Sequence, residues 1–394
     1  MRKKTDEGEG GGGGGGGGGE DDSIEGADAL RGGGGGKDAM PLIARDGAAV
    51  ITASMSLRRS AVLLRRLGEA NVLRNALEHD LPREPVKSGL VGIDVQYAGV
   101  NFHDTYVRTG LYPSASLPVV CGCEGAGIVS EVNGPDAKFA VGDRVAFFQY
   151  NAAYASHTTV PQTSCFKVPD GLDLQLAAAA LVQGFTAHYL ACDTFSLQPG
   201  HTTLVHAAGG GTGALLAQIA KLRGAHVIGT VSSDAKAKEA LAAGCDEVIN
   251  YSGGSTSQQQ QQQYDFLDAV RTLAPSGVDV VYDSIGQATA DQSLQSLAVR
   301  GTCVFYGNSS GPPSPIAPTP TLAKLGSLYI TRPVLEHYLR TDSERARRAE
   351  DVFGWVARGE LNVRVAKTFE LGEAADAHAF LESRMAMGKV LLRV

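Results

Sequence analysis

The residues best suited to chemistry form a glycine-rich run, His206-Ala207-Ala208-Gly209-Gly210-Gly211-Thr212-Gly213. An apolar segment typical of a buried strand precedes this run, and a segment typical of a helix follows it. Small residues let the backbone approach a pyrophosphate, and the first N–H groups of a helix carry partial positive charge. The run is not a strict G-x-G-x-x-G, but its context predicts a dinucleotide site. The alternative is merely a tight turn between strand and helix.

The end of the next predicted strand, His226–Val231, bears on which dinucleotide would bind. Sites for NAD usually carry a carboxylate there, and Asp234 falls about twenty residues after the glycines. Ser232, Ser233 and Lys236 instead suit a 2′-phosphate. We interpret Asp234 as the cap of the following helix. NADPH is therefore expected, and the assignment of Asp234 to a ribose hydroxyl stays open.

Alternating strands and helices must position this run. The pattern predicts strands at 202–208, 226–231, 247–251, 278–285 and 301–307, and helices at 213–222, 235–243, 264–274 and 288–299. Near-continuous apolar strands separated by helices indicate a parallel sheet covered on both faces. Right-handed crossovers make this a doubly wound α/β sheet of the Rossmann type.

The rest of the chain predicts a second domain and a leader. Residues 56–185 are rich in short β-like runs with Gly and Pro between them, and we expect residues 326–394 to complete this β-rich domain. The dinucleotide domain then spans residues 186–325. Residues 1–55, which contain the runs Gly11–Gly19 and Gly32–Gly36, are expected to be a disordered leader. Gln258–Gln263 is expected to enlarge a surface loop.

Composition excludes several classes of protein. The 394 residues carry a net charge of −7, of which −4 falls in residues 1–40, so strong electrostatic binding to nucleic acid is not expected. No apolar run is long enough for a transmembrane helix. Six cysteines are too few for a disulfide scaffold and favour a reducing compartment.

Charged residues directly after Met1 argue against a signal peptide. We expect a cytoplasmic protein, with organellar targeting not excluded.

Motifs spread along the chain resemble one family. They are residues 97–106 (Tyr-Ala-Gly-Val-Asn-Phe-His-Asp-Thr-Tyr), 110–113 (Gly-Leu-Tyr-Pro), 122–127 (Gly-Cys-Glu-Gly-Ala-Gly), the glycine-rich run, 281–284, 307–311 and 327–333. In this order they resemble the quinone oxidoreductase (zeta-crystallin-like) branch of the medium-chain dehydrogenase/reductase superfamily. The resemblance runs from about Leu57 to Val394 and implies a GroES-like catalytic domain with an inserted Rossmann domain that binds NADPH.

The resemblance also implies site residues. It implies that Phe102, His103, Asp104, Thr105 and Tyr106 lie along the nicotinamide, that Gly211 and Thr212 lie at the pyrophosphate, and that Ser232, Ser233, Lys236 and Tyr251 lie around the 2′-phosphate. It completes the cofactor site with Tyr189, Ser284, Tyr306, Gly307, Asn308, Ser309, Ser310, Gly311, Arg332 and Arg384. Two positions depart from the family pattern, because His103 stands where an aliphatic residue is common and Thr212 where Val is usual.

No metal is expected. Zinc-dependent members of the superfamily carry Cys, His and Cys where this chain has Asn101, Cys123 and Gln183, and a catalytic zinc needs three protein ligands. If Cys121 and Cys123 share a strand, they point to the same face, so a copper or redox role is the alternative to two buried thiols.

The expected function is NADPH-dependent quinone reduction, with Asn101, Tyr106 and Tyr112 as catalytic residues. Tyr106, Tyr112, His103 and water stay open as the proton donor. The alternatives are an enone or alkenal double-bond reductase, and a crystallin-like or AU-rich RNA-binding protein. A homodimer is expected through the edge strand of the Rossmann sheet near residues 301–307.

Overall fold

The computed structural model describes residues 57–113, 116–251 and 265–394. These residues all belong to one compact unit, Met55–Val394. The expected leader and the glutamine run of residues 258–263 lie outside the described residues. None of the helices in the described part of the chain combines the length and apolar character needed to cross a bilayer.

The first domain is built on a seven-stranded sheet. Its strand order is β15-β16-β3-β5-β6-β8, and β7 also pairs with β3. The strands are β3 (Leu90–Val100), β5 (Glu124–Val132), β6 (Arg144–Phe148), β7 (His157–Pro161), β8 (Cys165–Lys167), β15 (Val365–Glu370) and β16 (Lys389–Arg393). A three-stranded sheet adds β1 (Arg58–Leu64), β2 (Leu77–Pro82) and β4 (Val119–Val120). Residues near both ends of the described chain meet in one sheet, where β16 pairs with β3.

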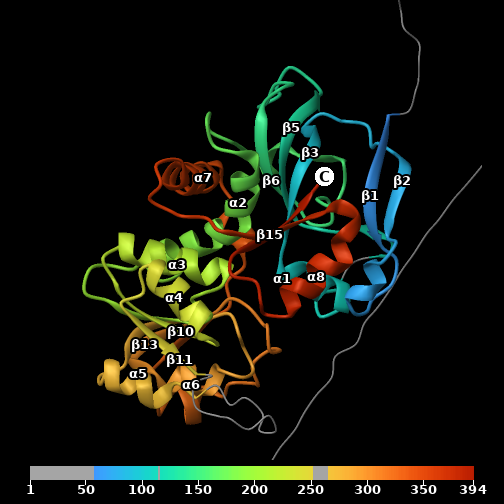
Figure 1. The fold of residues 1–394 in the computed structure, drawn as a ribbon. Helices are drawn as coiled ribbons and strands as arrows, with labels where there is room; N and C mark the ends of the chain where they lie inside the picture. The colour runs from blue at the N-terminus through green and yellow to red at the C-terminus, as the bar shows by residue number, and fades with distance from the viewer. Residues whose placement is uncertain (1–56, 114–115, 252–264) are drawn as a thin grey trace, which may run out of the picture. The chain divides into compact units, whose positions relative to one another are not determined.

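Strand β3 organises this domain because it pairs with β5, β7 and β16, all antiparallel. Val91, Ile93 and Val95 are buried in its core. Helices α1 (Phe102–Thr109), α2 (Leu174–Tyr189), α7 (Asp342–Ala357) and α8 (Ala374–Glu382) pack around the sheet. In Figure 1, α8 and α1 lie at one end of the sheet, and α2 and α7 lie beside β6. Short 3₁₀ or π turns complete the chain at η1 (Ala70–Leu73), η2 (Gln162–Ser164), η3 (Leu190–Thr194), η4 (Pro318–Ala323), η5 (Leu335–Tyr338) and η6 (Leu371–Glu373).

The second domain is a six-stranded parallel sheet, which confirms the predicted Rossmann-type fold. Its order is β11-β10-β9-β12-β13-β14, and every pair of neighbours is parallel. The strands are β9 (Thr202–Val205), β10 (His226–Val231), β11 (Glu247–Asn250), β12 (Val278–Asp283), β13 (Leu297–Phe305) and β14 (Tyr329–Thr331). Helices α3 (Gly211–Leu222), α4 (Asp234–Ala242), α5 (Leu267–Leu273) and α6 (Ala290–Gln295) cover the sheet, with α3 and α4 on one face and α5 and α6 on the other (Figure 1).

Three expectations about this domain are wrong in detail. The parallel sheet extends beyond residue 325, because Tyr329–Thr331 pairs with residues 302–304 of β13. β13 is therefore not the edge strand, and the proposed dimer edge near residues 301–307 is covered by β14. The helix expected at 288–299 ends at Gln295, because residues from Leu297 onward join β13, where Leu297 pairs with Val278 of β12. Sheet pairing overrides the local pattern at these positions.

Candidate active site

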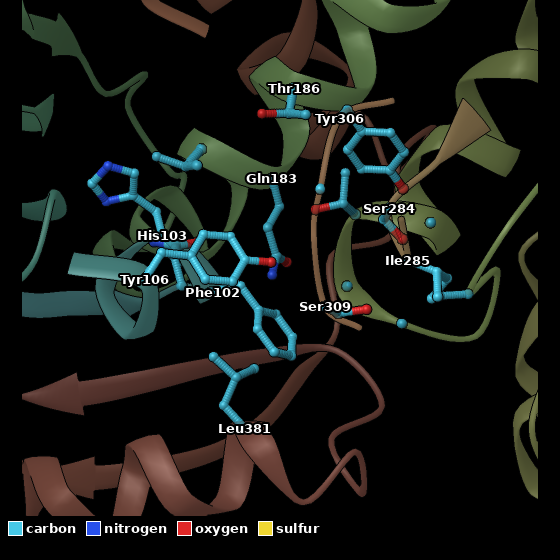
Figure 2. Close-up of a pocket in the computed structure, with 18 of the residues that line it drawn as sticks. Phe102, His103, Tyr106, Gln183, Thr186, Ser284, Ile285, Tyr306, Ser309 and Leu381 are labelled. Carbon is cyan, nitrogen blue, oxygen red and sulfur yellow. The ribbon is translucent and has the colours of Figure 1, made fainter. Parts of the chain in front are cut away.

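A cavity of about 480 Å³ is lined by residues of both domains. Its lining comes from the end of β3 and α1, from α2, from the loop before α3, and from the segments that follow β10, β12, β13 and α8. Figure 2 shows Phe102, His103 and Tyr106 on one side of the cavity, with Ser284, Tyr306 and Ser309 on the opposite side. The crevice at the carboxyl ends of parallel strands is where α/β sheets bind ligands.

Most of the predicted site residues meet in this cavity. The lining includes Asn101, Phe102, His103, Tyr106, Tyr112, Tyr189, Gly211, Thr212, Ser232, Lys236, Tyr251, Ser284, Tyr306, Gly307, Ser309, Arg332 and Arg384. Their collection from such distant segments is what a dinucleotide site across two domains requires.

Six predicted residues do not line the cavity: Asp104, Thr105, Ser233, Asn308, Ser310 and Gly311. They support the lining residues instead. Thr105 donates to Phe102 O at 2.8 Å, and Ser310 donates to Ile285 O at 2.8 Å. Gly311 adopts a φ of 105°, and its carbonyl oxygen accepts from Gln287 N.

The glycine-rich run closes tightly around the start of α3. Gly210 caps the helix without a side-chain hydrogen bond, so its first N–H groups are left to other partners. A Cβ at Gly211 would lie 2.3 Å from Gln183 Oε1, and a Cβ at Gly213 would lie 2.3 Å from Ala207 O. At Gly213 the neighbour is backbone, so only glycine fits there, whereas at Gly211 the end of the Gln183 side chain would have to move. The small residues leave room for an anion at the helix N-terminus.

The carboxyl end of β10 carries a cationic group of side chains. Lys236 Nζ donates to Ser232 Oγ at 3.2 Å and to Arg384 O at 2.7 Å. Burial, and secondly the charge of Arg384, lower the pKa of Lys236. Ser232, Tyr251 and Arg384 line the same cavity. Two cations held beside one another suit a dianionic group such as a phosphate.

Asp234 is not the helix cap that the sequence suggested. Ser233 occupies the cap position, and its Oγ accepts from Lys236 N at 3.3 Å. Asp234 is the first residue of α4, and its Oδ1 accepts from Asn250 Nδ2 at 2.7 Å. Asp234 does not line the cavity, which argues against a carboxylate that would bind a ribose hydroxyl.

The opposite end of the cavity is aromatic. Tyr106 and Tyr112 pack edge to face, with ring centroids 5.2 Å apart. Asn308 N donates to the Tyr106 hydroxyl at 3.1 Å, and Arg332 Nη2 donates to the Tyr112 hydroxyl at 2.9 Å. Burial raises the pKa of Tyr106 to about 12. Both predicted catalytic tyrosines are thus held by residues of the other domain.

Asn101 lines the cavity, but its amide is fully engaged beneath the floor. Its Nδ2 donates to Glu124 Oε1 at 2.6 Å, and its Oδ1 accepts from Lys389 Nζ at 2.8 Å. Lys389 and Glu124 form a buried ion pair, and Glu124 Oε2 also accepts from Val182 N of α2 at 2.7 Å. The amide therefore acts as part of the floor, and no amide atom is spare for a substrate.

The three positions that hold zinc in zinc-dependent relatives do not fit that ion here. Asn101 is bonded to Glu124 and Lys389, and the Lys389 ammonium would repel a cation. Gln183 packs against Gly211, which leaves Cys123 as the single thiol of the set. A catalytic zinc requires three protein ligands, and these three residues do not supply them.

One group of potential ligand atoms does gather among the described residues. Atoms of His103, Asp104 and Cys123 lie within 4.8 Å of one another. The Asp104 carboxylate, however, already accepts from Asn101 N at 2.9 Å and from the Tyr154 hydroxyl at 3.1 Å. Both bonds are accepted by Oδ2, so Oδ1 is the oxygen that faces His103. The expectation of no metal stays a prediction.

The cysteines are buried or half-buried thiols, and all six are free. The sequence allowed Cys121 and Cys123 to share one face of a strand, but they do not. They follow β4 and flank Gly122, whose φ is 82°. Burial raises the pKa of both thiols, that of Cys121 to about 12. Such thiols are poor nucleophiles.

Sequence reasoning missed part of the lining. Gln183 and Thr186 of α2, and Tyr150, Leu335 and Glu336 near the aromatic end, also line the cavity. Residues 183 and 186 lie three apart on one helix face, a spacing that a helical reading of residues 174–189 could have found. Glu336 follows β14, whose place in the sheet was not foreseen.

Comparison with known proteins identifies the family. The model of the alcohol dehydrogenase GroES-like domain matches residues 87–197, and that of zinc-binding dehydrogenases matches residues 211–347. A quinone oxidoreductase of Pseudomonas aeruginosa is 39% identical over 295 residues, which cover 75% of this chain and 88% of that protein. A 2-haloacrylate reductase of a Burkholderia species is 41% identical over 301 residues, covering 75% and 87% respectively.

A solved structure agrees in fold. The Escherichia coli quinone oxidoreductase complexed with NADPH superposes with a TM-score of 0.77 at 35% identity, covering 85% of this chain and all of that one. The chain belongs to the quinone oxidoreductase family of the medium-chain dehydrogenase/reductase superfamily.

Proposed function

We propose that this protein is an NADPH-dependent quinone reductase. The observation that carries the proposal is a single cavity that joins the N-terminus of α3, the cationic group at β10 and the aromatic end at α1. Relatives named quinone oxidoreductase, one of them solved with NADPH, support it. NADPH supplies a hydride when bound, and the protein supplies binding, orientation and exclusion of water.

The 2′-phosphate of NADPH is assigned to Ser232, Lys236, Tyr251 and Arg384. Lys236 and Arg384 stand side by side at some electrostatic cost, which a phosphate would offset. The pyrophosphate is assigned to the backbone at the start of α3, because residues 209–213 line the cavity and most of them are glycines.

The nicotinamide and the acceptor share the aromatic end. Tyr106 and Tyr112 form one wall, fixed by Asn308 and Arg332. Flat apolar walls favour a planar ring such as a quinone. A quinone is already electron-poor, so it needs less Lewis-acid polarisation than an alcohol substrate would.

A second candidate is reduction of an activated carbon–carbon double bond. The observation that favours it is the 41% identity with a 2-haloacrylate reductase. The same cavity would serve, because hydride delivery to a conjugated carbonyl needs the same orientation of the nicotinamide. Quinone reduction remains the proposal, since the aromatic walls match a planar ring better than a small acrylate.

Steady-state turnover tests both the cofactor and the acceptor. The purified chain is assayed with NADPH and NADH against a 1,4-naphthoquinone, an alkenal and 2-chloroacrylate. We expect NADPH-driven quinone reduction to have the highest kcat/KM. Rapid acrylate or alkenal reduction with an inert quinone would select the second candidate.

Lys236→Ala provides the matched test of the phosphate site. Because the variant loses a charge-assisted contact, we expect KM for NADPH to rise about 10- to 100-fold while KM for NADH stays nearly constant. Lys238→Ala, on the same helix but outside the cavity lining, is the control. Equal losses for both coenzymes would contradict the assignment.

We also propose a cytoplasmic homodimer. Six free cysteines fit a reducing compartment. The edge strand β14 presents exposed Tyr329 and Ile330 and has no partner on its outer side among the described strands. Light scattering of the wild type and of Ile330→Lys tests the dimer, since a charge at a paired edge should dissociate it.

A further inference from the structure

Quinone reduction needs a proton besides the hydride. The balance is quinone + NADPH + H⁺ → hydroquinone + NADP⁺, in which the hydride brings two electrons and one hydrogen. The remaining proton must reach an acceptor oxygen at the aromatic end of the cavity. This inference rests on the proposed function and concerns where that proton comes from.

His103 is the one imidazole among the described residues that line the cavity. It is the second residue of α1, which places it beside Phe102 and one turn before Tyr106. Its side chain is 28% exposed. In Figure 2 it lies on the same side of the cavity as Tyr106 and Phe102, across from the Rossmann-domain residues.

The ring of His103 is fixed by aromatic neighbours. It stacks on Tyr150 with centroids 4.7 Å apart and an interplanar angle of 20°. It also meets Tyr112 edge to face at 5.6 Å. Nδ1 is buried without a hydrogen bond, so Nε2 is the ring nitrogen that a molecule in the cavity can reach.

The carboxylate of Asp104 lies on the Nδ1 side of the His103 ring. Its Oδ1 lies 3.7 Å from His103 Nδ1. Burial raises the pKa of this carboxyl, but His103, His378 and the backbone of Asn101 together lower it further, so Asp104 remains ionised. The ionised carboxylate therefore lies on the Nδ1 side of the ring, opposite the nitrogen that a molecule in the cavity can reach.

Tyr106, Tyr150 and Cys123 are less suited to proton transfer near neutral pH. Burial raises the pKa of Tyr106 to about 12. Burial, and then the charge of Glu336, raise the pKa of Tyr150 further still. Burial also raises the pKa of the Cys123 thiol. General acids work best when their pKa lies near the working pH.

We propose that His103 is the general acid of this enzyme and that Asp104 is its positioning residue. The Nε2–H bond breaks and an O–H bond forms at one quinone oxygen, while NADPH delivers its hydride to the quinone, so that hydroquinone, NADP⁺ and a neutral imidazole result. The imidazole then regains a proton from solvent through the open side of the cavity. Asp104 keeps its charge throughout.

Other titratable groups of α1 and α8 lie near His103 and Asp104. Arg108, on the next turn of α1, is paired with Glu382 of α8 by two hydrogen bonds. His378 of α8 reaches Asp104 through the Tyr154 hydroxyl, with 3.1 Å at each step. Burial holds the pKa of His378 at about 4, so it is neutral in the range where an ordinary histidine titrates.

The test measures kcat/KM for a 1,4-naphthoquinone from pH 5 to 9 in the wild type, His103→Phe and His103→Gln. A general acid must be protonated, so wild-type activity should fall as the pH rises, and this fall should be absent from both variants. In both variants kcat should be about 10²- to 10³-fold lower than in the wild type. The dependence of kcat/KM on pH should disappear in both. His103→Phe retains an aromatic ring, and His103→Gln retains a polar side chain.

Rescue and binding separate catalysis from structure. Added imidazole should restore part of the turnover of His103→Ala, which a packing role would not allow. NADPH affinity, followed by its fluorescence, should change less than about threefold in His103→Gln. His226→Gln, at an exposed position outside the cavity lining, is the matched control.

The outcomes distinguish the two proposals. A wild type that reduces no quinone with NADPH overturns the proposed function and this inference together. An active wild type whose His103 variants keep the rate and the pH profile overturns this inference alone.

Discussion

Lys389 is a cation with no exposed surface, enclosed with the carboxylate of Glu124 and the amide of Asn101. Such a group is tolerated because each partner satisfies another, and the same contacts fix Asn101 under the cavity. Removing one member leaves the opposite charge buried and unpaired. Leaving one buried charge unpaired therefore lowers the free energy of unfolding by more than replacing both charged residues with apolar ones would.

We therefore expect Lys389→Met to lower the free energy of unfolding by about 3–5 kcal/mol, as measured by urea denaturation. The double variant Lys389→Met/Glu124→Gln should recover part of this loss, because no uncompensated charge remains. Lys367→Met, on the neighbouring strand β15 with an exposed side chain, is the control. A double variant no more stable than Lys389→Met would contradict the argument.

At the scale of elements, the start of α3 depends on residues that have no side chain. Gly213 packs with its Cα against the carbonyl of Ala207, whose own φ is 53°. The approach brings the helix onto the end of β9 and points its N-terminus into the cavity.

Gly213→Ala should displace α3, because its Cβ would come within 2.3 Å of Ala207 O. We expect the free energy of unfolding to fall by about 1–3 kcal/mol and KM for NADPH to rise. Gly372→Ala, whose Cβ would meet only Leu77 at 3.5 Å, should change stability by less than about 0.5 kcal/mol. Equal effects of the two substitutions would refute the packing argument.

Local pattern predicted most elements and failed where distant pairing decides. β10 matches its expected bounds, because residues 226–231 are apolar and followed by turn residues. β14 was missed, because three residues make a strand only when β13 supplies the pairing. In the site, the glycine-rich run and α1 were found from motifs. The engagement of the Asn101 amide by Lys389 could not be found, because the two residues lie 288 positions apart.

For the whole molecule, buried histidines set the response to acid. His378 is 1% exposed, and burial lowers its pKa from 6.5 to about 4. Burial also lowers the pKa values of His157, His188 and His206. The unfolded chain therefore binds more protons than the folded one below pH 6.5, and acid favours unfolding.

Stability should accordingly fall as the pH drops from about 6.5 to about 4, and it should be at its full value above that window. For His378 alone the expected loss is about 3 kcal/mol. Urea denaturation at a series of pH values gives the free energy of unfolding as a function of pH. The slope of this dependence between pH 4 and 6.5 should be shallower for His378→Asn than for the wild type. His226→Gln, at a position that is exposed in the folded chain, is the control. An unchanged slope in His378→Asn would count against the assignment.

The pairing of β16 with the end of β3 has a consequence for biosynthesis. A ribosome makes residues 90–100 long before residues 389–393, yet Val390 pairs with Val100 beside the cavity floor. The Rossmann sheet lies wholly between them, so it can fold while the first domain still waits for its last partner. Until then the edge of β3 is open, and a nascent polypeptide is most exposed to chaperones or to misassembly at that point.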